Sequence, residues 1–179
     1  MTSRASMRIH HIYRPAVALC VLLWASAALA QSSLPPNLHL PSLYREVVES
    51  IAGRSATFRE QLVRIAAEPR VTINLVFVPR IIGARAKTRM VVHIDELDAH
   101  VEVAYLENIV ELIAHEFEHV IEQMEGMNFA VMSDAGDPGI SSSVSASGDN
   151  VFETKRAARA GVSVAREVHA SLRNENSHP

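Results

Sequence analysis

Residues 114–126 read AHEFEHVIEQMEG. They belong to a longer segment, 107–125, in which apolar residues recur at the three- and four-residue spacing of an amphipathic helix. These apolar residues are Ile109, Leu112, Ile113, Val120, Ile121 and Met124, and Gly126 follows them as a helix terminator. The pattern predicts a helix that carries two histidines and several acids, and the rest of the fold is expected to pack around it.

The five residues from His115 to His119 have the spacing H-E-x-x-H. Residues four apart on a helix lie one turn apart on the same face, so both histidines can direct imidazole nitrogens at one ion. Zinc binds such nitrogens at about 2.0–2.1 Å. Glu116 is offset by one residue, which places its carboxylate beside the ion, where it can deprotonate a water molecule. The bland alternative is an acidic helix whose two histidines are solvated and bind nothing.

Two histidines do not complete a catalytic zinc site, which usually has three protein ligands and one open position. The downstream candidates for the third ligand are Asp134, Asp137, Asp149, Glu153, Glu167 and His169. We favour Glu153, because it opens the last predicted helix in FETKRAARAG, where the helix dipole favours a carboxylate in the first turn.

Two helices and three strands are expected before the H-E-x-x-H helix. SLYREVVESIAG (42–53) and TFREQLVRIAA (57–67) have helical spacing, and Ser55 is a suitable N-cap for the second. VTINLVFV (71–78), TRMVVHI (88–94) and HVEVAYL (100–106) are β-branched and partly alternating. The chain is therefore expected to be an α+β protein with a small, mainly antiparallel or mixed three-stranded sheet.

The region after the H-E-x-x-H helix divides into a connection and a last helix. Residues 126–150 contain four glycines, a proline and the tract SSSVSASG, which predicts a long flexible connection. The final helix is expected from Phe152 to about Leu172, with Ala157, Ala160, Val164 and Val168 on its apolar face. A single domain, 42–173, would then lie between a polar leader, 31–41, and a short tail, 174–179.

The first thirty residues resemble a secretory signal peptide. Arg4, Arg8 and Arg14 precede the apolar run AVALCVLLWASAALA (16–30), and Ala28-Leu29-Ala30 has the small-x-small form of a cleavage site. Export to the periplasm or the exterior of a bacterium is expected, with an uncleaved anchor as the alternative. The run is shorter than the roughly 20 residues of a spanning helix, so the mature chain is not expected to insert stably into a membrane.

Cleavage would remove Cys20, the only cysteine, which excludes disulfides and thiolate chemistry from the mature chain. It would also leave 14 basic and 20 acidic residues, a net charge of −6 with histidines neutral. This balance argues against nucleic acid as the main partner. Arg80, Arg85, Lys87 and Arg89 form a basic loop that is expected to be solvated, with an acidic partner as the alternative.

The order of strands, H-E-x-x-H helix and glutamate-bearing helix resembles the zincin metallopeptidases, specifically the small gluzincin type. LIAHEFEHVIEQMEG (112–126) and FETKRAARAG (152–161) also resemble segments of uncharacterised secreted bacterial proteins with this arrangement. The resemblance covers roughly residues 55–165. It implies a zincin-like fold, zinc ligands at His115, His119 and Glu153, and Glu116 as the general base that activates water against a peptide carbonyl.

Two departures from the gluzincin pattern concern the surroundings of the metal. Many gluzincins place an acid four residues after the ligand glutamate, to orient the first histidine, and Ala157 occupies that position here. Glu111 and Glu122 lie one turn from the histidines and are expected to be solvated surface charges, with support of the histidines as the alternative. The oxyanion-stabilising group is open among Tyr105, His169, Arg156 and Arg159.

Three functions remain after the sequence analysis. The first is a secreted zinc metallopeptidase that acts on peptide or protein substrates. The second is a non-catalytic zinc-binding or interaction protein that retains the zincin fold. The third is a helical adaptor with no metal.

Overall fold

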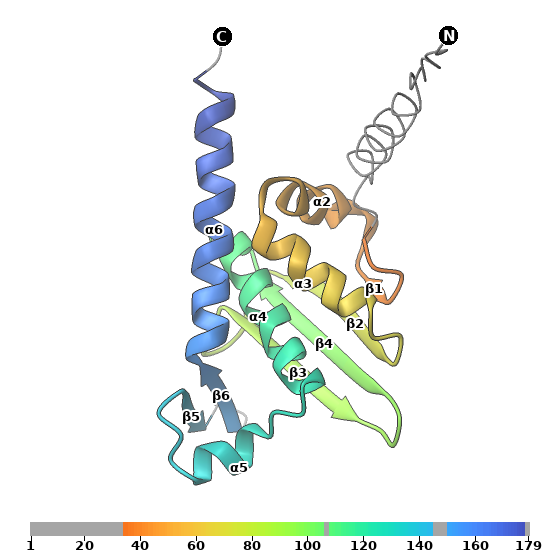
Figure 1. The fold of residues 1–179 in the computed structure, drawn as a ribbon, viewed down its shortest axis with the longest axis vertical. Coiled ribbons are helices and arrows are strands. Elements are labelled where there is room, and N and C mark those ends of the chain that lie inside the picture. Colours follow the sequence, from red (N-terminus) through yellow and green to blue (C-terminus); the bar gives the residue numbers. More distant parts are fainter. Residues whose placement is uncertain (1–33, 106–107, 145–149, 178–179) are drawn as a thin grey trace, which may run out of the picture. The chain divides into compact units, whose positions relative to one another are not determined.

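The computed structural model describes residues 34–105, 108–144 and 150–177 (Figure 1). The predicted signal peptide lies outside these described residues. The elements run in the order β1 (Leu38–His39), η1 (Ser42–Tyr44, a 3-10 helix), α2 (Arg45–Arg54), α3 (Ala56–Ala66), β2 (Val71–Val78), β3 (Ala86–Val92), β4 (Leu97–Ala104), α4 (Ile109–Met124), α5 (Phe129–Asp134), β5 (Ile140–Val144), β6 (Asn150–Thr154) and α6 (Lys155–Glu175). Within the described ranges, no helix is both long and apolar enough to cross a membrane.

A four-stranded mixed sheet has the strand order β1-β2-β4-β3. Strands β1 and β4 run parallel to β2, whereas β3 runs antiparallel to β4 and forms the edge next to it. The three predicted strands are confirmed, and β2 has the predicted bounds. Strand β1 was not predicted, because two residues are too few to show a periodic pattern.

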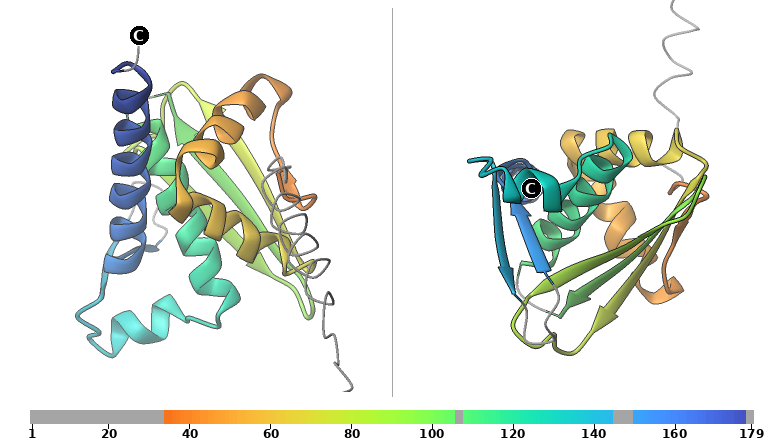
Figure 2. Two further views of the ribbon diagram at one scale, coloured as in Figure 1. Left: turned by 45° about the horizontal axis from the view of Figure 1, so that its top comes forward. Right: turned by 90° about the horizontal axis from the view of Figure 1, so that it is seen from below.

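One face of this sheet is apolar and packs against helices. Alternate residues of β2 and β4 are buried, as the period of two in a strand requires. Helices α3 and α4 lie over this face (Figure 2), where Phe58 of α3 stacks on Phe117 of α4 with ring centroids 5.7 Å apart. The core residues all belong to the compact unit Leu34–Pro179. This unit therefore has its own hydrophobic core, as an independently folding domain requires.

The N-terminus of α3 is closed by residues from two helices. The hydroxyl of Ser55 accepts a 3.0 Å hydrogen bond from the backbone N–H of Phe58, which confirms the predicted N-cap. The same hydroxyl donates to the carboxylate of Glu167 in α6 at 2.7 Å. The backbone N–H of Thr57 donates to the same Glu167 carboxylate at 3.1 Å. Glu167, one of the candidates for the third ligand, is thus a contact between α3 and α6.

Helix α6 packs closely along α4 because of a glycine. A Cβ atom at Gly161 would lie 2.8 Å from the backbone oxygen of Glu111 and 3.3 Å from the Cβ of His115. Ala157, Val164 and Val168 are buried on the same side of α6, as predicted, while Gly161 was not among the predicted residues. The close approach brings the start of α6 to the histidine-bearing face of α4.

A polar network joins α3, α4 and α6. The buried carboxylate of Glu118 accepts hydrogen bonds from Gln61 Nε2 at 2.7 Å and from Arg156 Nε at 2.6 Å. Arg156 also pairs with Glu125, and so does Arg64. Arg156 is therefore committed to this network, which removes it from the candidates for the oxyanion-stabilising group.

The segment predicted as a long connection is partly regular. Gly126 has a φ of 83° after the end of α4 and is followed by α5. Strands β5 and β6 then pair antiparallel in a second, two-stranded sheet. Residues 145–149, which include Asp149, lie outside the described residues. The chain therefore leaves the end of α4 through α5 and β5, and β6 brings it back to α4.

The prediction that Glu153 opens the last helix is wrong. Glu153 lies on β6, paired with Ser141, and α6 begins only at Lys155. Thr154 is the N-cap, with its hydroxyl accepting from the backbone N–H of Ala157 at 3.0 Å. Threonine caps helices well, and the residues before it pair in a strand, so the helix starts two residues after Glu153. Glu153 is held by strand pairing, and not by a place in the first turn of the helix.

Candidate metal site

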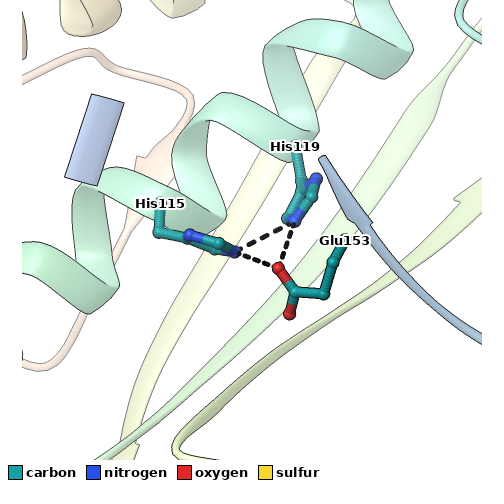
Figure 3. Close-up of side chains that lie close together, drawn as sticks. All are labelled: His115, His119 and Glu153. Atoms are coloured by element: carbon teal, nitrogen blue, oxygen red, sulfur yellow. Dashed lines mark hydrogen bonds and ion pairs between the residues drawn. The ribbon is translucent and has the colours of Figure 1, made fainter. Parts of the chain in front are cut away.

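His115, His119 and Glu153 lie together as a group that could hold a metal ion (Figure 3). The Nε2 atoms of the two histidines are 3.1 Å apart. Glu153 Oε2 lies 3.0 Å from His115 Nε2 and 4.0 Å from His119 Nε2. Ligands at 2.0–2.1 Å around a tetrahedral ion are separated by about 3.3 Å. The three atoms therefore have separations close to those that a zinc ion requires.

A buried carboxylate supports the second histidine. His119 Nδ1 lies 3.1 Å from Glu122 Oε2, and Glu122 is fully buried. The other carboxylate oxygen of Glu122 accepts a 2.7 Å hydrogen bond from the hydroxyl of Thr154. A carboxylate at Nδ1 holds the proton on that nitrogen and leaves the Nε2 lone pair for an ion. Glu122, which the sequence also allowed as a solvated charge, has the position of an orienting residue.

Glu116 is buried beside the group and held by the edge strand. The residue is 6% exposed, and its carboxylate accepts a 2.6 Å hydrogen bond from the hydroxyl of Thr88 in β3. Burial raises the pKa of Glu116, although the hydrogen bond from Thr88 and the nearby charges of His119 and His115 act in the opposite direction. Glu116 is not one of the three ligand candidates.

The charges of His115 and Glu153 stabilise each other. The pKa of Glu153 is lowered mainly by its hydrogen bond with His115, against the effect of burial, and the charges of His115, His119 and Arg85 lower it further. Burial alone would lower the pKa of His115, but the hydrogen bond with Glu153 and the charges of Glu116, Glu153 and Glu122 raise it overall. The group is thus arranged to hold positive charge, which is what a cation site needs.

Exposure differs among the three side chains. The side chains of His119 and His115 are 8% and 16% exposed, whereas that of Glu153 is 55% exposed. Aromatic rings lie on one side: Phe129 of α5 meets His119 edge to face at 5.8 Å, and Phe152 stacks on Phe129 at 6.1 Å. The group is therefore anchored at the histidines and reaches solvent near Glu153, where a fourth ligand can enter.

Among the described residues, the other candidates for the third ligand do not belong to this group. Asp137 binds the backbone N–H of Gly139, Asp134 ends α5, and His169 is exposed on α6. Tyr105, a candidate for the oxyanion-stabilising group, packs against Tyr44 and Phe77.

Arg85 lies near the metal group, and this proximity was not predicted from the sequence. Its charge contributes to lowering the pKa of Glu153, although it lies in the loop before β3. The sequence contained no signal for this, because the proximity depends on how the β2–β3 connection folds toward β6.

Comparisons with known proteins add no family. A scan against protein-family models finds no match, and searches of the curated proteins and of the solved structures find none either. The inference of function therefore depends on the residues and their geometry. They support an α+β fold with a His-x3-His helix, and a His115, His119 and Glu153 group that could bind a metal ion.

Proposed function

We propose that this chain is a secreted zinc-dependent metallopeptidase. The observation that carries the proposal is the convergence of His115, His119 and Glu153 to 3.0–4.0 Å, although Glu153 is 34 positions beyond His119 in the chain. Two imidazoles and one carboxylate are a donor set that suits zinc. The buried carboxylate of Glu116 adjoins this set, which is the arrangement that hydrolysis needs.

The three ligands and their supports would hold the ion. A bound zinc ion supplies Lewis acidity, which polarises a carbonyl oxygen and makes water acidic enough to lose a proton near neutral pH. Glu122 and Thr154 keep His119 in the tautomer with a free Nε2. Glu153 would supply the third ligand from β6, a strand of the second sheet, whereas both histidines come from α4.

Glu116 acts as the general base. Its carboxylate accepts the proton of the attacking water and passes it to the leaving amine. Its raised pKa suits both steps, because a stronger base takes the proton more readily and holds it until transfer. Thr88 fixes the orientation of the carboxylate through one oxygen and leaves the other oxygen for the water.

The edge strand β3 supports a peptide as the substrate. Thr88 links β3 to Glu116, and within the described sheet β3 pairs on one side only. The free edge of a strand offers backbone N–H and C=O groups, to which an extended peptide can add as a further strand. A substrate bound in this way would pass beside Glu116 and the metal group.

A metal-content and activity measurement tests the proposal. We expect the purified protein to contain about one zinc ion per chain and to cleave an unstructured protein in a chelator-sensitive reaction. His119→Ala should lose the metal, whereas His100→Ala, at an exposed histidine of β4, should keep it. Glu116→Gln should keep the metal and lose about 10²–10⁴-fold in rate.

The second candidate is a metal-binding protein without catalysis. It is favoured because two candidates for the oxyanion-stabilising residue make other contacts. Arg156 pairs with Glu118, and the ring of Tyr105 packs against Phe77. Zinc binding in the wild type with no chelator-sensitive cleavage of a broad peptide library would select this function. Absence of bound zinc in the wild type and in His119→Ala alike would reject both.

A further inference from the structure

The outward side of α6 carries a line of basic residues. Lys155, Arg159, Arg166, His169 and Arg173 are exposed and follow one another at intervals of three, four or seven residues, so they lie on one side of the helix. At 1.5 Å per residue, the line from Lys155 to Arg173 is about 27 Å long. We call these five residues the basic stripe.

The basic stripe faces away from the packed side of α6. The buried residues Ala157, Gly161, Val164 and Val168 lie roughly opposite to it around the helix. The acids of α6 do not neutralise it: Glu167 is hydrogen bonded to the start of α3, and Glu175 pairs with Arg54. Within the part of the chain that the structure describes, the lysine and the three arginines of the stripe have no ion-pair partner.

This arrangement is unfavourable for an isolated helix. Lys155 is the first residue of α6 and the first turn contains no acid, so its charge opposes the positive end of the helix dipole. Lys155 and Arg159 are also like charges four residues apart, which destabilises a helix slightly. The stripe lies on a chain in which acids outnumber basic residues by 20 to 17. Positive charge is thus concentrated on this side of α6, although the chain as a whole is acidic.

We propose that the basic stripe is a docking face for an anionic lipid bilayer. A straight, convex helix presents its cations along a line, which fits a plane of phosphate headgroups better than it fits a cleft. Val162 is 55% exposed on the same side and can enter the headgroup region. Helix α6 contains no Phe, Tyr or Trp on which a nucleobase could stack, which disfavours single-stranded nucleic acid. The predicted export of the chain also favours a membrane surface as the anionic partner.

The proposed docking is electrostatic and reversible. Each basic residue held near an anionic surface raises binding roughly fivefold. Four such residues act together only where salt does not screen them, since the Debye length is about 10 Å at 0.1 M. Binding should therefore be strong at low ionic strength and weaken steeply as salt increases. The docking face is independent of the proposed metallopeptidase activity.

Vesicle co-sedimentation tests the docking face. The chain from Gln31, which contains the whole unit Leu34–Pro179, is used so that the apolar N-terminal segment does not insert. It should bind vesicles of equal parts phosphatidylcholine and phosphatidylglycerol at low salt, and not vesicles of phosphatidylcholine alone. The triple variant Arg159→Gln, Arg166→Gln, Arg173→Gln should bind on the order of a hundredfold more weakly. Arg166→Gln alone should lose roughly fivefold, which preserves the test if the triple variant does not fold.

A matched variant distinguishes the effect of the basic stripe from the effect of the protein's net charge. Arg45→Gln, Arg80→Gln, Arg89→Gln removes three exposed arginines on α2, the β2–β3 connection and β3, and should bind as the wild type does. Equal losses in both triple variants would overturn the proposal. Binding that survives in the stripe variants would overturn it too. Tighter, stripe-dependent binding of a single-stranded oligonucleotide would show that nucleic acid is the partner and would likewise reject a bilayer.

Discussion

The hydroxyl of Thr154 donates a 2.7 Å hydrogen bond to the fully buried carboxylate of Glu122. Through this one contact the residue next to Glu153 is connected to the residue that orients His119. The third ligand candidate and the second histidine are therefore positioned by the same buried group, although they come from β6 and α4. Loss of the contact should affect metal binding before it affects the fold.

Glu122→Gln should weaken zinc binding by about 10–100-fold. The neutral amide is a poorer acceptor for His119 Nδ1–H, and its NH₂ group cannot accept the hydrogen bond from Thr154. Zinc affinity measured by competition with a chromophoric chelator checks this. Thr154→Ser, which keeps both the hydroxyl and the helix cap, is the control and should retain wild-type affinity. An unchanged affinity in Glu122→Gln would show that the carboxylate has no orienting role.

Gly161→Ala should destabilise the protein, since its Cβ would meet the backbone oxygen of Glu111 at 2.8 Å. The forced separation of α4 and α6 should cost about 1–3 kcal/mol, reduced by up to about 1 kcal/mol from the better helix propensity of alanine. Urea unfolding measures the difference.

The matched control for this substitution is Gly53→Ala in α2, where no atom lies within 4 Å of the added Cβ. Here only the propensity gain acts, so stability should be unchanged or rise by up to about 1 kcal/mol. Because Gly161 also adjoins His115, Gly161→Ala should weaken zinc binding, and Gly53→Ala should not. Equal stability of the two variants would mean that α6 adapts without cost.

Much of the fold and of the metal group could be predicted from local patterns. Strand alternation gave β2 its bounds, Ser55 was recognisable as a cap, and the spacing of His115 and His119 needed only helical geometry. Glu153 was identified, but its place on β6 was not, because its pairing partner Ser141 lies in the serine-rich segment whose composition predicts a flexible connection.

The burial of Glu122 could not be predicted from periodicity. A periodic pattern identifies one apolar face, whereas α4 is enclosed by the sheet, α3 and α6 and therefore buries Glu116, Glu118 and Glu122 as well. Their partners, Thr88, Arg156 and Thr154, lie 28 or more residues away in the sequence. Gly161 carried no signal either, since a helical glycine indicates a close approach only once the neighbouring helix is known.

Zinc should stabilise the folded chain through the three ligand candidates. An ion that binds only the native state raises the free energy of unfolding by about 2.7 kcal/mol at a concentration 100 times its dissociation constant. Thermal unfolding with added zinc, and after chelation, measures the shift in Tm. Glu153→Ala should lose most of the zinc-dependent increase, whereas Glu175→Ala, at an exposed acid of α6, should keep it. A zinc-independent Tm in the wild type would contradict metal binding and favour an adaptor without metal.

Glu167→Gln should produce a stability loss that depends on pH. Partial burial alone would raise the pKa of Glu167, but hydrogen bonds from Thr57, Ser55 and the backbone at the start of α3 outweigh it and lower the pKa in the folded state. Because the folded pKa is below the unfolded value of about 4.3, the ionised carboxylate stabilises the fold fully above that value. This contribution disappears as the pH falls through the folded pKa.

The expected difference between wild type and Glu167→Gln is about 1 kcal/mol at pH 7, allowing for solvent screening at this partly exposed position. It should shrink below about pH 4.3, where the wild-type carboxyl gains its proton and resembles the neutral amide. Urea unfolding of both proteins between pH 7 and pH 3.5 measures it, with Glu60→Gln on the exposed side of α3 as the control of equal charge. A deficit that stays constant across this range would show that Glu167 joins α6 to α3 through packing rather than through its charge.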